Sequence, residues 1–422
     1  MAELAQTVID ALQKFEFGYP FVMAAVWIAG GVFFWWFEER PGPDPARPPR
    51  LARYPKAAVI VPCHNEARQI VETIDALTRL SYPNYEIVAV DDGSTDGTGR
   101  LLETLAATEP RLRVVRLATN RGKATALRAG AEATDAEFLI CVDGDALLDA
   151  HAPTWMVRAL TLGLRVGGVT GNPRIRTRST TLGRLQLGEF SSLVGLIKRT
   201  QMVWGRLFTV SGVVCGFRKR ALAEVGYWSP DALTDDVDIS WRLQLGGWGI
   251  RFEPRALCWI LMPETLRGLW RQRLRWATGA VQVLLRSLPQ LMSGRSHGMW
   301  IIAADYLTSV AWAVVTFALS VWWLVGLLPG VSLPVTVGGL VPGAWGVTLA
   351  LMFLLQVAVG MALDRRYEPG IWRYLPSVIA YPVLFWLVIV LTVIVGLPRA
   401  LLRARGRPGV WVSPDRGLEL PA

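Results

Sequence analysis

The stretch that decides the fold is residues 137–145, Glu-Phe-Leu-Ile-Cys-Val-Asp-Gly-Asp. Its apolar, β-prone run Phe138–Val142 predicts a buried strand, and Asp143 and Asp145 follow at the carboxyl end of that strand. Open α/β folds bind their ligands at this edge of the sheet. With Gly144 between them, the two carboxylates suit a hard divalent cation that carries a substrate's phosphates. An ordinary Asp-Gly turn is the alternative, and the tripeptide alone favours it.

The residues before this stretch alternate between strand and helix patterns. Strands are predicted at residues 57–62, 85–90, 112–116 and 137–142, with a helix pattern in each interval. This βαβα order predicts an α/β fold with a parallel sheet of the nucleotide-binding type. Polar residues follow the first two strands and open the third helix: Pro62, Asn65, Glu66, Asp91, Asp92 and Lys123.

Two of these clusters have a possible role in nucleotide binding. Asp91 and Asp92 at a strand end suit a base N–H group and ribose hydroxyls, although Asp-Asp-Gly-Ser is also a good turn sequence. Lys123 follows Gly122 at a predicted helix start, where it could meet a phosphate beside the helix N–H groups. An exposed helix lysine is the alternative.

Two further clusters lie in the second half of the chain. Asp235 and Asp236 precede a helical pattern, where a carboxylate is most often a cap but also suits general-base work on a sugar hydroxyl. The second cluster reads Gln272-Arg273-Leu274-Arg275-Trp276. Its arginines can neutralise a leaving diphosphate, and its tryptophan can stack under a sugar ring.

The composition indicates a membrane protein that contains a polar domain, because 52% of the 422 residues are hydrophobic and only 18% are charged. Membrane spans are expected at residues 21–37, 301–328, 345–363 and 374–397. Basic residues after the first span place residues 40–56 in the cytoplasm, and three later crossings would then put the basic C-terminal tail outside. The last segment, interrupted by prolines, is therefore also interpreted as a re-entrant hairpin or a paired crossing.

The chain is accordingly divided into six parts. They are an N-terminal transmembrane segment (1–40), a basic linker (41–56), a cytoplasmic catalytic domain (57–265), interfacial helices (266–299), a C-terminal transmembrane region (300–397) and a basic tail (398–422). The stretches 182–208 and 266–292 look amphipathic, which fits a membrane surface and equally a buried core helix. Four scattered cysteines imply neither a disulfide framework nor a zinc site.

The clusters at residues 91–94, 143–145, 234–236 and 272–276, in this order and with flanking membrane segments, resemble the processive family 2 glycosyltransferases. Further stretches, such as Gly171–Thr180 and Glu189–Gln201, are similar to the members of that family that make poly-β-1,6-N-acetylglucosamine. The resemblance covers about residues 20–417. It implies a GT-A nucleotide-sugar-binding domain with a mixed, mostly parallel sheet, flanked by transmembrane and interfacial helices.

The same resemblance implies a role for each cluster. Asp91 and Asp92 would hold uridine, and Asp143 and Asp145 would hold the nucleotide through Mg²⁺ or Mn²⁺. Asp236 would take the proton of the acceptor hydroxyl. The family usually has Glu at position 235, where this chain has Asp, so positioning around that residue is expected to differ. The remaining residues would lie by the nucleotide-sugar (Pro62, Asn65, Glu66, Lys123) or form the acceptor floor and diphosphate contact (Gln272, Arg275, Trp276, with Arg273 in support).

The activity implied by the resemblance is inverting, processive transfer of N-acetylglucosamine from UDP-N-acetylglucosamine to a growing β-1,6-linked biofilm polysaccharide, together with help in its export. The expected location is the bacterial inner (plasma) membrane, and the resemblance would also suggest a small accessory membrane subunit. The alternatives are another UDP-sugar β-glycosyltransferase, making a hyaluronan-, chitin- or cellulose-like polymer or adding one sugar to a lipid carrier, and an inactive membrane scaffold. The formal charge of +10 does not favour nucleic acid as a partner, because the arginines cluster beside membrane segments.

Overall fold

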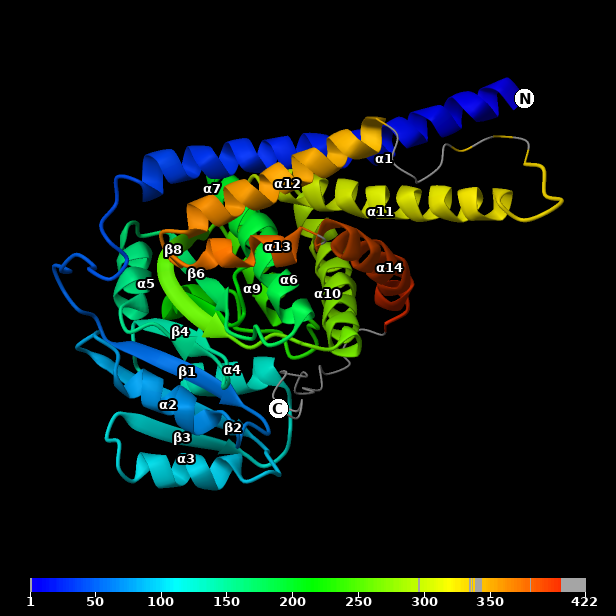
Figure 1. Ribbon diagram of the computed structural model, residues 1–422. Helices are drawn as coiled ribbons and strands as arrows, with labels where there is room; N and C mark the ends of the chain where they lie inside the picture. Colours follow the sequence, from blue (N-terminus) through cyan, green and yellow to red (C-terminus); the bar gives the residue numbers. More distant parts are fainter. Residues whose placement is uncertain are drawn as a thin grey trace.

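A mixed eight-stranded sheet forms the centre of the protein (Figure 1). The computed structural model describes residues 2–294, 297–333, 335, 337, 344–379 and 381–403. The strand order is β3-β2-β1-β4-β7-β6-β8-β5. The strands are β1 Ala57–Cys63, β2 Tyr85–Asp92, β3 Leu112–Leu117, β4 Phe138–Val142, β5 Leu147–Leu148, β6 Val166–Ile175, β7 Val214–Arg218 and β8 Gly249–Ile260.

The first four strands form the parallel half of the sheet, as the sequence predicts. β1 pairs in parallel with β2 and β4, and β2 pairs in parallel with β3. β7 is antiparallel to β4 and β6, β5 is antiparallel to β8, and β6 and β8 are parallel. The parallel strands therefore present their carboxyl ends along one edge, which is where the predicted polar clusters lie.

Helices cover both faces of this half, so β1 and β4 are buried along their whole length. On one face, Val59 and Val61 share a core with residues of α2 (Ile70–Thr78) and α5 (Ala152–Thr161). On the other, Ile60 shares a core with residues of α4 (Lys123–Glu132) and α9 (Asp235–Leu245). The remaining short helices of the domain are α3 (Thr98–Ala106) and α8 (Lys219–Glu224).

The two amphipathic stretches are helical, as predicted. Residues 181–203 form α6 (Thr181–Glu189), the π-helical η2 (Phe190–Gly195) and α7 (Leu196–Val203) in succession. Residues 266–292 form the single helix α10 (Leu266–Met292), which packs against α9 and against the C-terminal α14 (Tyr381–Leu402). α10, which carries the 272–276 cluster, therefore lies between the sheet domain and the C-terminal α14.

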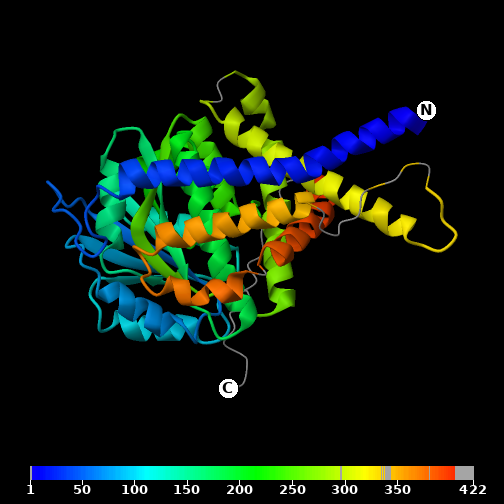
Figure 2. The same ribbon diagram turned by 45° about the horizontal axis from the view of Figure 1, so that its top comes forward.

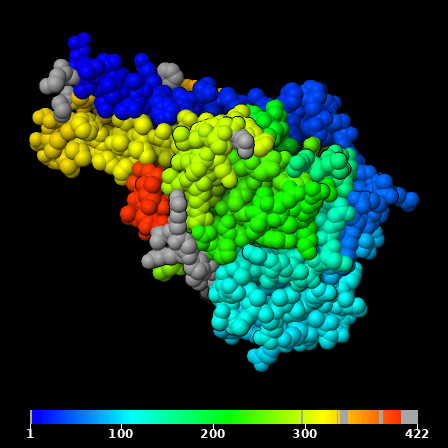
Figure 3. Space-filling view, turned by 180° about the vertical axis from the view of Figure 1, so that it is seen from behind, coloured from blue at the N-terminus to red at the C-terminus, as the bar shows by residue number. Residues whose placement is uncertain are grey.

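In the part of the chain that the structure describes, three helices are long and apolar enough to cross a membrane: Glu3–Glu39, Trp300–Gly326 and Gly346–Asp364. They comprise α1 (Ala2–Phe34) with the π-helical η1 (Trp35–Glu39), then α11 (Trp300–Gly326) and most of α12 (Ala344–Asp364). α1 packs against α7, α11 and α12. Figures 1 and 2 show α1 and α11 running past the end of the sheet domain, and Figure 3 shows the same projection from behind.

The predicted span at 374–397 is broken, which agrees with its proline interruption. The chain forms η3 (Ile371–Tyr374) and α13 (Leu375–Val378), and a separate α14 begins at Tyr381. Proline lacks the N–H that continues a helix and favours a helix start, and Pro376 and Pro382 lie near the starts of α13 and α14. Among the described residues of this region, Trp386–Leu402 is a shorter apolar helix. Most of the basic tail predicted at 398–422 lies outside the described residues.

Candidate functional site

The carboxyl ends of β1, β2 and β4 bring three of the predicted clusters together. Cys63 at the end of β1 is in register with Asp91 at the end of β2. A Cβ atom added to Gly144 would lie 3.2 Å from Glu66 Cγ and 3.3 Å from the carbonyl oxygen of Pro62. A side chain at this position would be crowded, because the loop after β4 packs directly on the end of β1 and the loop that follows it. The 143–145 tripeptide therefore lies among the predicted nucleotide-sugar residues.

Asp91 and Asp92 are both buried and accept hydrogen bonds from the backbone. Asp91 Oδ1 accepts from the N–H of Ser94 at 3.0 Å. The two oxygens of Asp92 accept from the N–H groups of Arg121 and Gly122, each at 2.8 Å. Burial raises the pKa of Asp92, and the two backbone donors act against that rise. Asp92 thus holds the turn that opens α4, and the uridine contact of this pair stays a prediction.

The loop after β1 joins the loops after β2 and β3. Asn65 has a left-handed backbone (φ 56), and its Oδ1 accepts from the N–H of Thr95 at 2.9 Å. His64 Nδ1 lies 2.9 Å from the carbonyl oxygen of Asp92, and its Nε2 lies 3.0 Å from Asn120 Nδ2. His64 and Asn120 carry no recognisable signal in the sequence, because a lone histidine has no spacing pattern before its partners in space are known.

Lys123 begins α4, as predicted, and turns toward the cation carboxylates. Its Nζ donates to Asp143 Oδ1 at 2.5 Å and to the carbonyl oxygen of Gly212 at 3.1 Å. Burial by itself lowers the pKa of Lys123, but the charges of Asp143, Asp235 and Asp236 outweigh burial and raise the pKa. Lys123 is therefore a fixed positive charge inside the site, and the exposed-lysine alternative is wrong.

Asp143 and Asp145 have the chemistry of a site that shares a cation with its substrate. Burial and then the charge of Asp143 raise the pKa of Asp145 to about 7. A bound cation would relieve the repulsion between the two like charges. Within the described part of the chain, no three His, Cys, Asp or Glu side chains form a complete metal site. Mg²⁺ or Mn²⁺ would then take its other ligands from water and phosphate oxygens, as Mg²⁺ does at many nucleotide sites.

Asp236 lies in the first turn of α9, next to the Lys123 contact. Its Oδ1 accepts from the N–H of Val237 at 2.9 Å, and a Cβ added to Gly212 would lie 3.2 Å from its Oδ2. The N-cap residue of α9 is Thr234, so neither Asp235 nor Asp236 occupies the cap position. Burial, followed by the charge of Asp235, raises the pKa of Asp236, while Lys123 and Arg275 lower it.

The 272–276 cluster is held against the start of α9 by a close helix contact. A Cβ added to Gly279 would lie only 2.5 Å from Thr234 Oγ1, so α10 can approach this closely only with glycine there. Arg275 is exposed and donates from Nη1 to the carbonyl oxygen of Leu233 at 3.2 Å. Trp276 is partly buried on the same helix. Arg275 is thereby brought close enough for its charge to act on Asp236.

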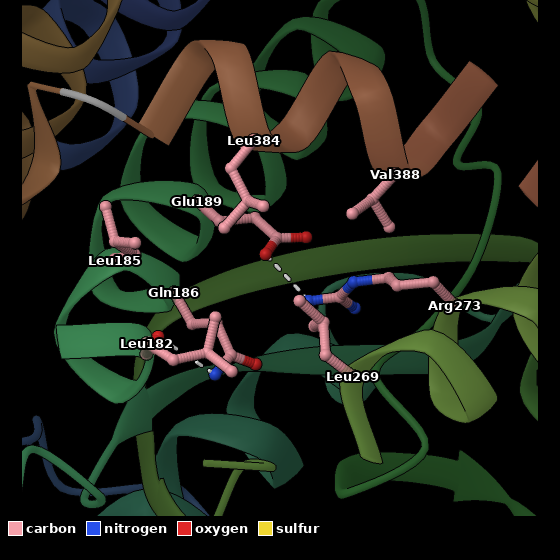
Figure 4. A pocket seen from close by; sticks show the side chains of 8 residues that line it. All are labelled: Leu182, Leu185, Gln186, Glu189, Leu269, Arg273, Leu384 and Val388. Carbon is pink, nitrogen blue, oxygen red and sulfur yellow. Dashed lines mark hydrogen bonds and ion pairs between the residues drawn. The ribbon is translucent and has the colours of Figure 1, made fainter. Parts of the chain in front are cut away.

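Arg273 supports this cluster from inside the protein and does not face the nucleotide edge. It is buried, its Nη2 lies 2.7 Å from Glu189 Oε2, and its guanidinium lies 4.1 Å from the centre of the Trp276 ring. Figure 4 shows this ion pair across a small pocket between α6, α10 and α14, which is otherwise lined mainly by leucines. Gln272 Oε1 is also buried, without a hydrogen-bond partner among the described residues. The role of Glu189 could not be predicted from the sequence, because an ion pair between residues this far apart in the chain has no local signal.

The relationship to known proteins agrees with this geometry. Residues 58–226 match the model of the family described as Glycosyl transferase family 2. The poly-β-1,6-N-acetyl-D-glucosamine synthase of Staphylococcus epidermidis is 34% identical over 402 residues, which cover 94% of this chain and 97% of that protein. The chain belongs to glycosyltransferase family 2. The synthase of the same name from Staphylococcus aureus is also 34% identical, over 400 residues.

The fold of this family 2 glycosyltransferase is the GT-A fold that the resemblance implied. A solved structure of the mannosyltransferase PcManGT from Pyrobaculum calidifontis, in complex with GDP-Man and Mn²⁺, superposes with a TM-score of 0.63. The match covers 94% of this chain and 99% of that one at 23% sequence identity. At this identity the likeness establishes the fold alone, and the chemistry of this glycosyltransferase follows from its own residues and from its family.

Proposed function

We propose that this glycosyltransferase polymerises N-acetylglucosamine from UDP-N-acetylglucosamine into a β-1,6-linked polysaccharide and helps to export it. The identity of the polymer is supported by the near full-length relationship to the two staphylococcal synthases. The proposed chemistry is supported by one structural observation: Gly212 contacts both halves of the site. Its carbonyl oxygen accepts from Lys123, which also binds Asp143, and its Cα faces the carboxylate of Asp236.

In the proposed reaction, the acceptor hydroxyl attacks the anomeric carbon of the donor directly and inverts it. Asp236 takes the hydroxyl proton as the new C–O bond forms and the bond to the diphosphate of UDP breaks. Burial makes the Asp236 carboxylate a stronger base, and the nearby Lys123 and Arg275 keep it ionised before the reaction. The same two cations stabilise the charge that grows on the departing diphosphate.

The donor would be held at the edge formed by β1, β2 and β4. Asp143 and Asp145 are the residues that would hold a divalent cation, as Mn²⁺ is bound in PcManGT, and the cation would neutralise diphosphate charge. This edge is surrounded by four polar residues and by the hydrogen-bonded loops that join them: Asn65, Glu66, Asp91 and Asp92. Trp276 would form the floor under the acceptor sugar, with its ring fixed by the guanidinium of Arg273.

The proposed location is a bacterial plasma membrane, with several crossings and the catalytic domain on the cytoplasmic side. Three candidate membrane helices support the crossings. The orientation is supported by five basic residues that follow the first of them: Arg40, Arg47, Arg50, Arg53 and Lys56. Nucleotide-sugar donors are cytoplasmic compounds, so this side also suits the chemistry.

Asp236→Asn tests the assignment of the base, because it keeps the size of the side chain and removes its basicity. Polymer synthesis should fall by at least a thousandfold, a rough value for loss of a general base, while calorimetric titration with UDP should give wild-type affinity. The control is Asp135→Asn, which alters a carboxylate that is 83% exposed and distant from the site. Equal loss of UDP binding and synthesis in Asp236→Asn would contradict the base assignment.

The polymer is identified by supplying purified membranes with a panel of UDP-sugars and digesting the product with linkage-specific hydrolases. Incorporation of N-acetylglucosamine into a ladder of long chains, sensitive only to a β-1,6-specific enzyme, is the expected result. A single short product would refute polymerisation, and a different donor would refute the proposed polymer while leaving the site chemistry intact.

A further inference from the structure

Lys198 of α7 is a buried lysine for which neither the proposed reaction nor the sequence motifs provide a role. Only 5% of its surface is exposed. Its Nζ donates to Thr170 Oγ1 at 3.0 Å and to Ser211 Oγ, and it lies 5.9 Å from the centre of the Phe252 ring. In the described part of the chain, both hydrogen-bond acceptors of Lys198 are hydroxyl oxygens and none is a carboxylate. Burying an ammonium group is costly, which argues for a specific use of this one.

The contact with Ser211 connects Lys198 to residues 210–212, named here the base-facing segment. Each of its three residues is held by a different element. The N–H of Val210 donates to Ser240 Oγ at 2.9 Å, and the N–H of Ser211 donates to Thr170 Oγ1 at 2.8 Å. The carbonyl oxygen of Gly212 accepts from Lys123. Because Thr170 Oγ1 also accepts from Lys198, the lysine and the segment share one hydroxyl as an anchor.

The base-facing segment in turn lies against Asp236. A Cβ on Gly212 would lie 3.2 Å from Asp236 Oδ2, and Ser240, which holds Val210, donates to the backbone carbonyl of Asp236 at 2.6 Å. A small displacement of the segment would therefore either crowd the carboxylate or leave a gap beside it. Effective proton transfer needs a base held within hydrogen-bond reach of the acceptor hydroxyl, so the position of this segment matters for the reaction.

We propose that Lys198 is a positioning residue for Asp236, which holds the base-facing segment in place and provides a positive charge that favours the ionised carboxylate. The proposal rests on the proposed function, in which Asp236 is the general base. The other charged groups that act on Asp236 are Asp235 on the same helix, Lys123 from α4 and Arg275 from α10.

The opposite charges of Lys198 and Asp236 stabilise each other. Burial lowers the pKa of Lys198 to about 7, and the charge of Asp236 acts against that decrease. The other titratable group that acts on Lys198 is Cys215 of β7. The charge of Lys198 is therefore present at low pH and is lost as the pH rises through the neutral range. Activity should consequently show an acidic limb from Asp236 and a basic limb from Lys198.

The test compares the rate of UDP release against pH for the full-length enzyme in lipid nanodiscs, with UDP-N-acetylglucosamine as donor. Lys198→Gln keeps a hydrogen-bond donor without the charge, and it should lower kcat by about tenfold and move the acidic limb upward by about one pH unit. Lys198→Arg keeps the charge at all accessible pH values, so it should leave the acidic limb in place and remove the basic limb. Lys56→Gln, a surface lysine at the far end of β1, should retain the wild-type profile.

Ser211→Ala provides a second variant should Lys198→Gln not fold. It keeps the lysine and removes one hydroxyl acceptor of the ammonium group, so it should lower kcat, leave the acidic limb in place and move the basic limb to lower pH. A wild-type pH profile for Lys198→Gln, or a lower kcat with both limbs unmoved in both lysine variants, would overturn the proposal. A fully active Asp236→Asn enzyme would instead refute the base assignment and the proposal with it. An inactive Asp236→Asn enzyme together with unmoved Lys198 profiles would refute the proposal alone.

Discussion

Arg199 offers the sharpest test of how the candidate membrane helices are attached to the sheet domain. Its side chain is fully buried between α7, η1 and the end of α12. Its Nε lies 2.5 Å from Glu39 Oε1, and its Nη2 lies 3.0 Å from Asp364 Oδ1. Replacing Arg199 with Met keeps the bulk of the side chain and removes the positive charge that the two carboxylates share.

The expected cost follows from what each carboxylate retains. Asp364 keeps a second ion pair, because its Oδ2 lies 2.5 Å from Arg174 Nη1. Among the described residues, the carboxylate of Glu39 would keep the hydroxyl of Tyr367, at 2.6 Å, and no ion pair, because Arg255 and Arg366 bind its backbone carbonyl; Glu39 is 1% exposed. Removing one partner of a buried ion pair typically costs ~3–5 kcal/mol, mainly because a charge is left uncompensated. Of the two carboxylates, only Glu39 loses its ion pair, so Arg199→Met should lower the free energy of unfolding by about 3 kcal/mol.

The measurement is a denaturant titration of the detergent-solubilised protein, followed by tryptophan fluorescence. Glu39→Gln combined with Arg199→Met should recover much of the loss, because it removes the uncompensated charge as well. The matched control is Arg220→Met, which breaks an ion pair with Glu224 whose arginine side chain is 79% exposed, and it should change the stability by less than about 0.5 kcal/mol. An Arg199→Met effect as small as that of the control would refute the reasoning, as would a double variant no more stable than Arg199→Met.

Two further predictions concern the site. Gly212→Ala should lower the rate of transfer by about tenfold or more at unchanged UDP affinity, because the added Cβ would lie 3.2 Å from Asp236 Oδ2. The control is Gly18→Ala in α1, where the added Cβ meets open space and the rate should not change. Equal rates for the two variants would contradict the crowding. Trp276→Ala should reduce polymer length and yield without changing UDP binding, measured by gel analysis and calorimetry, and an unchanged chain length would remove its acceptor role.

The arrangement of the residues proposed to bind the donor could be predicted from the sequence, because it depends on local patterns. Each of its clusters directly follows a strand, and parallel strands place their carboxyl ends at one edge, so Asp91 and Asp143 had to lie near each other. The register of Cys63 with Asp91 and the packing of Gly144 on Glu66 agree with that expectation. No knowledge of distant contacts was needed for this result.

The contacts of α7 with the rest of the protein could not be predicted from local sequence patterns. Lys198 of α7 contacts Thr170 of β6 and Ser211 of the base-facing segment. Arg199 contacts Glu39, which lies 160 positions earlier in the sequence. Such contacts depend on how the helices pack against one another, and residue spacing within the chain does not predict that packing. The break before α14 is an intermediate case, since hydropathy predicted a span over 374–397 while its prolines indicated an interruption.

These observations together place α7 between Asp236, the proposed base, and the candidate membrane helices α1 and α12. Lys198 and Arg199 are consecutive, and both lie near Phe252, with Nζ and Cζ at 5.9 and 5.7 Å from the ring centre. One binds the segment that faces Asp236, and the other binds η1 and α12. Successive helix residues point about 100° apart, so one turn of α7 reaches both partners without any flexible connection. A shift of α1 or α12 that displaces Arg199 must therefore also disturb Lys198, and variants at the two positions should be non-additive in transfer rate.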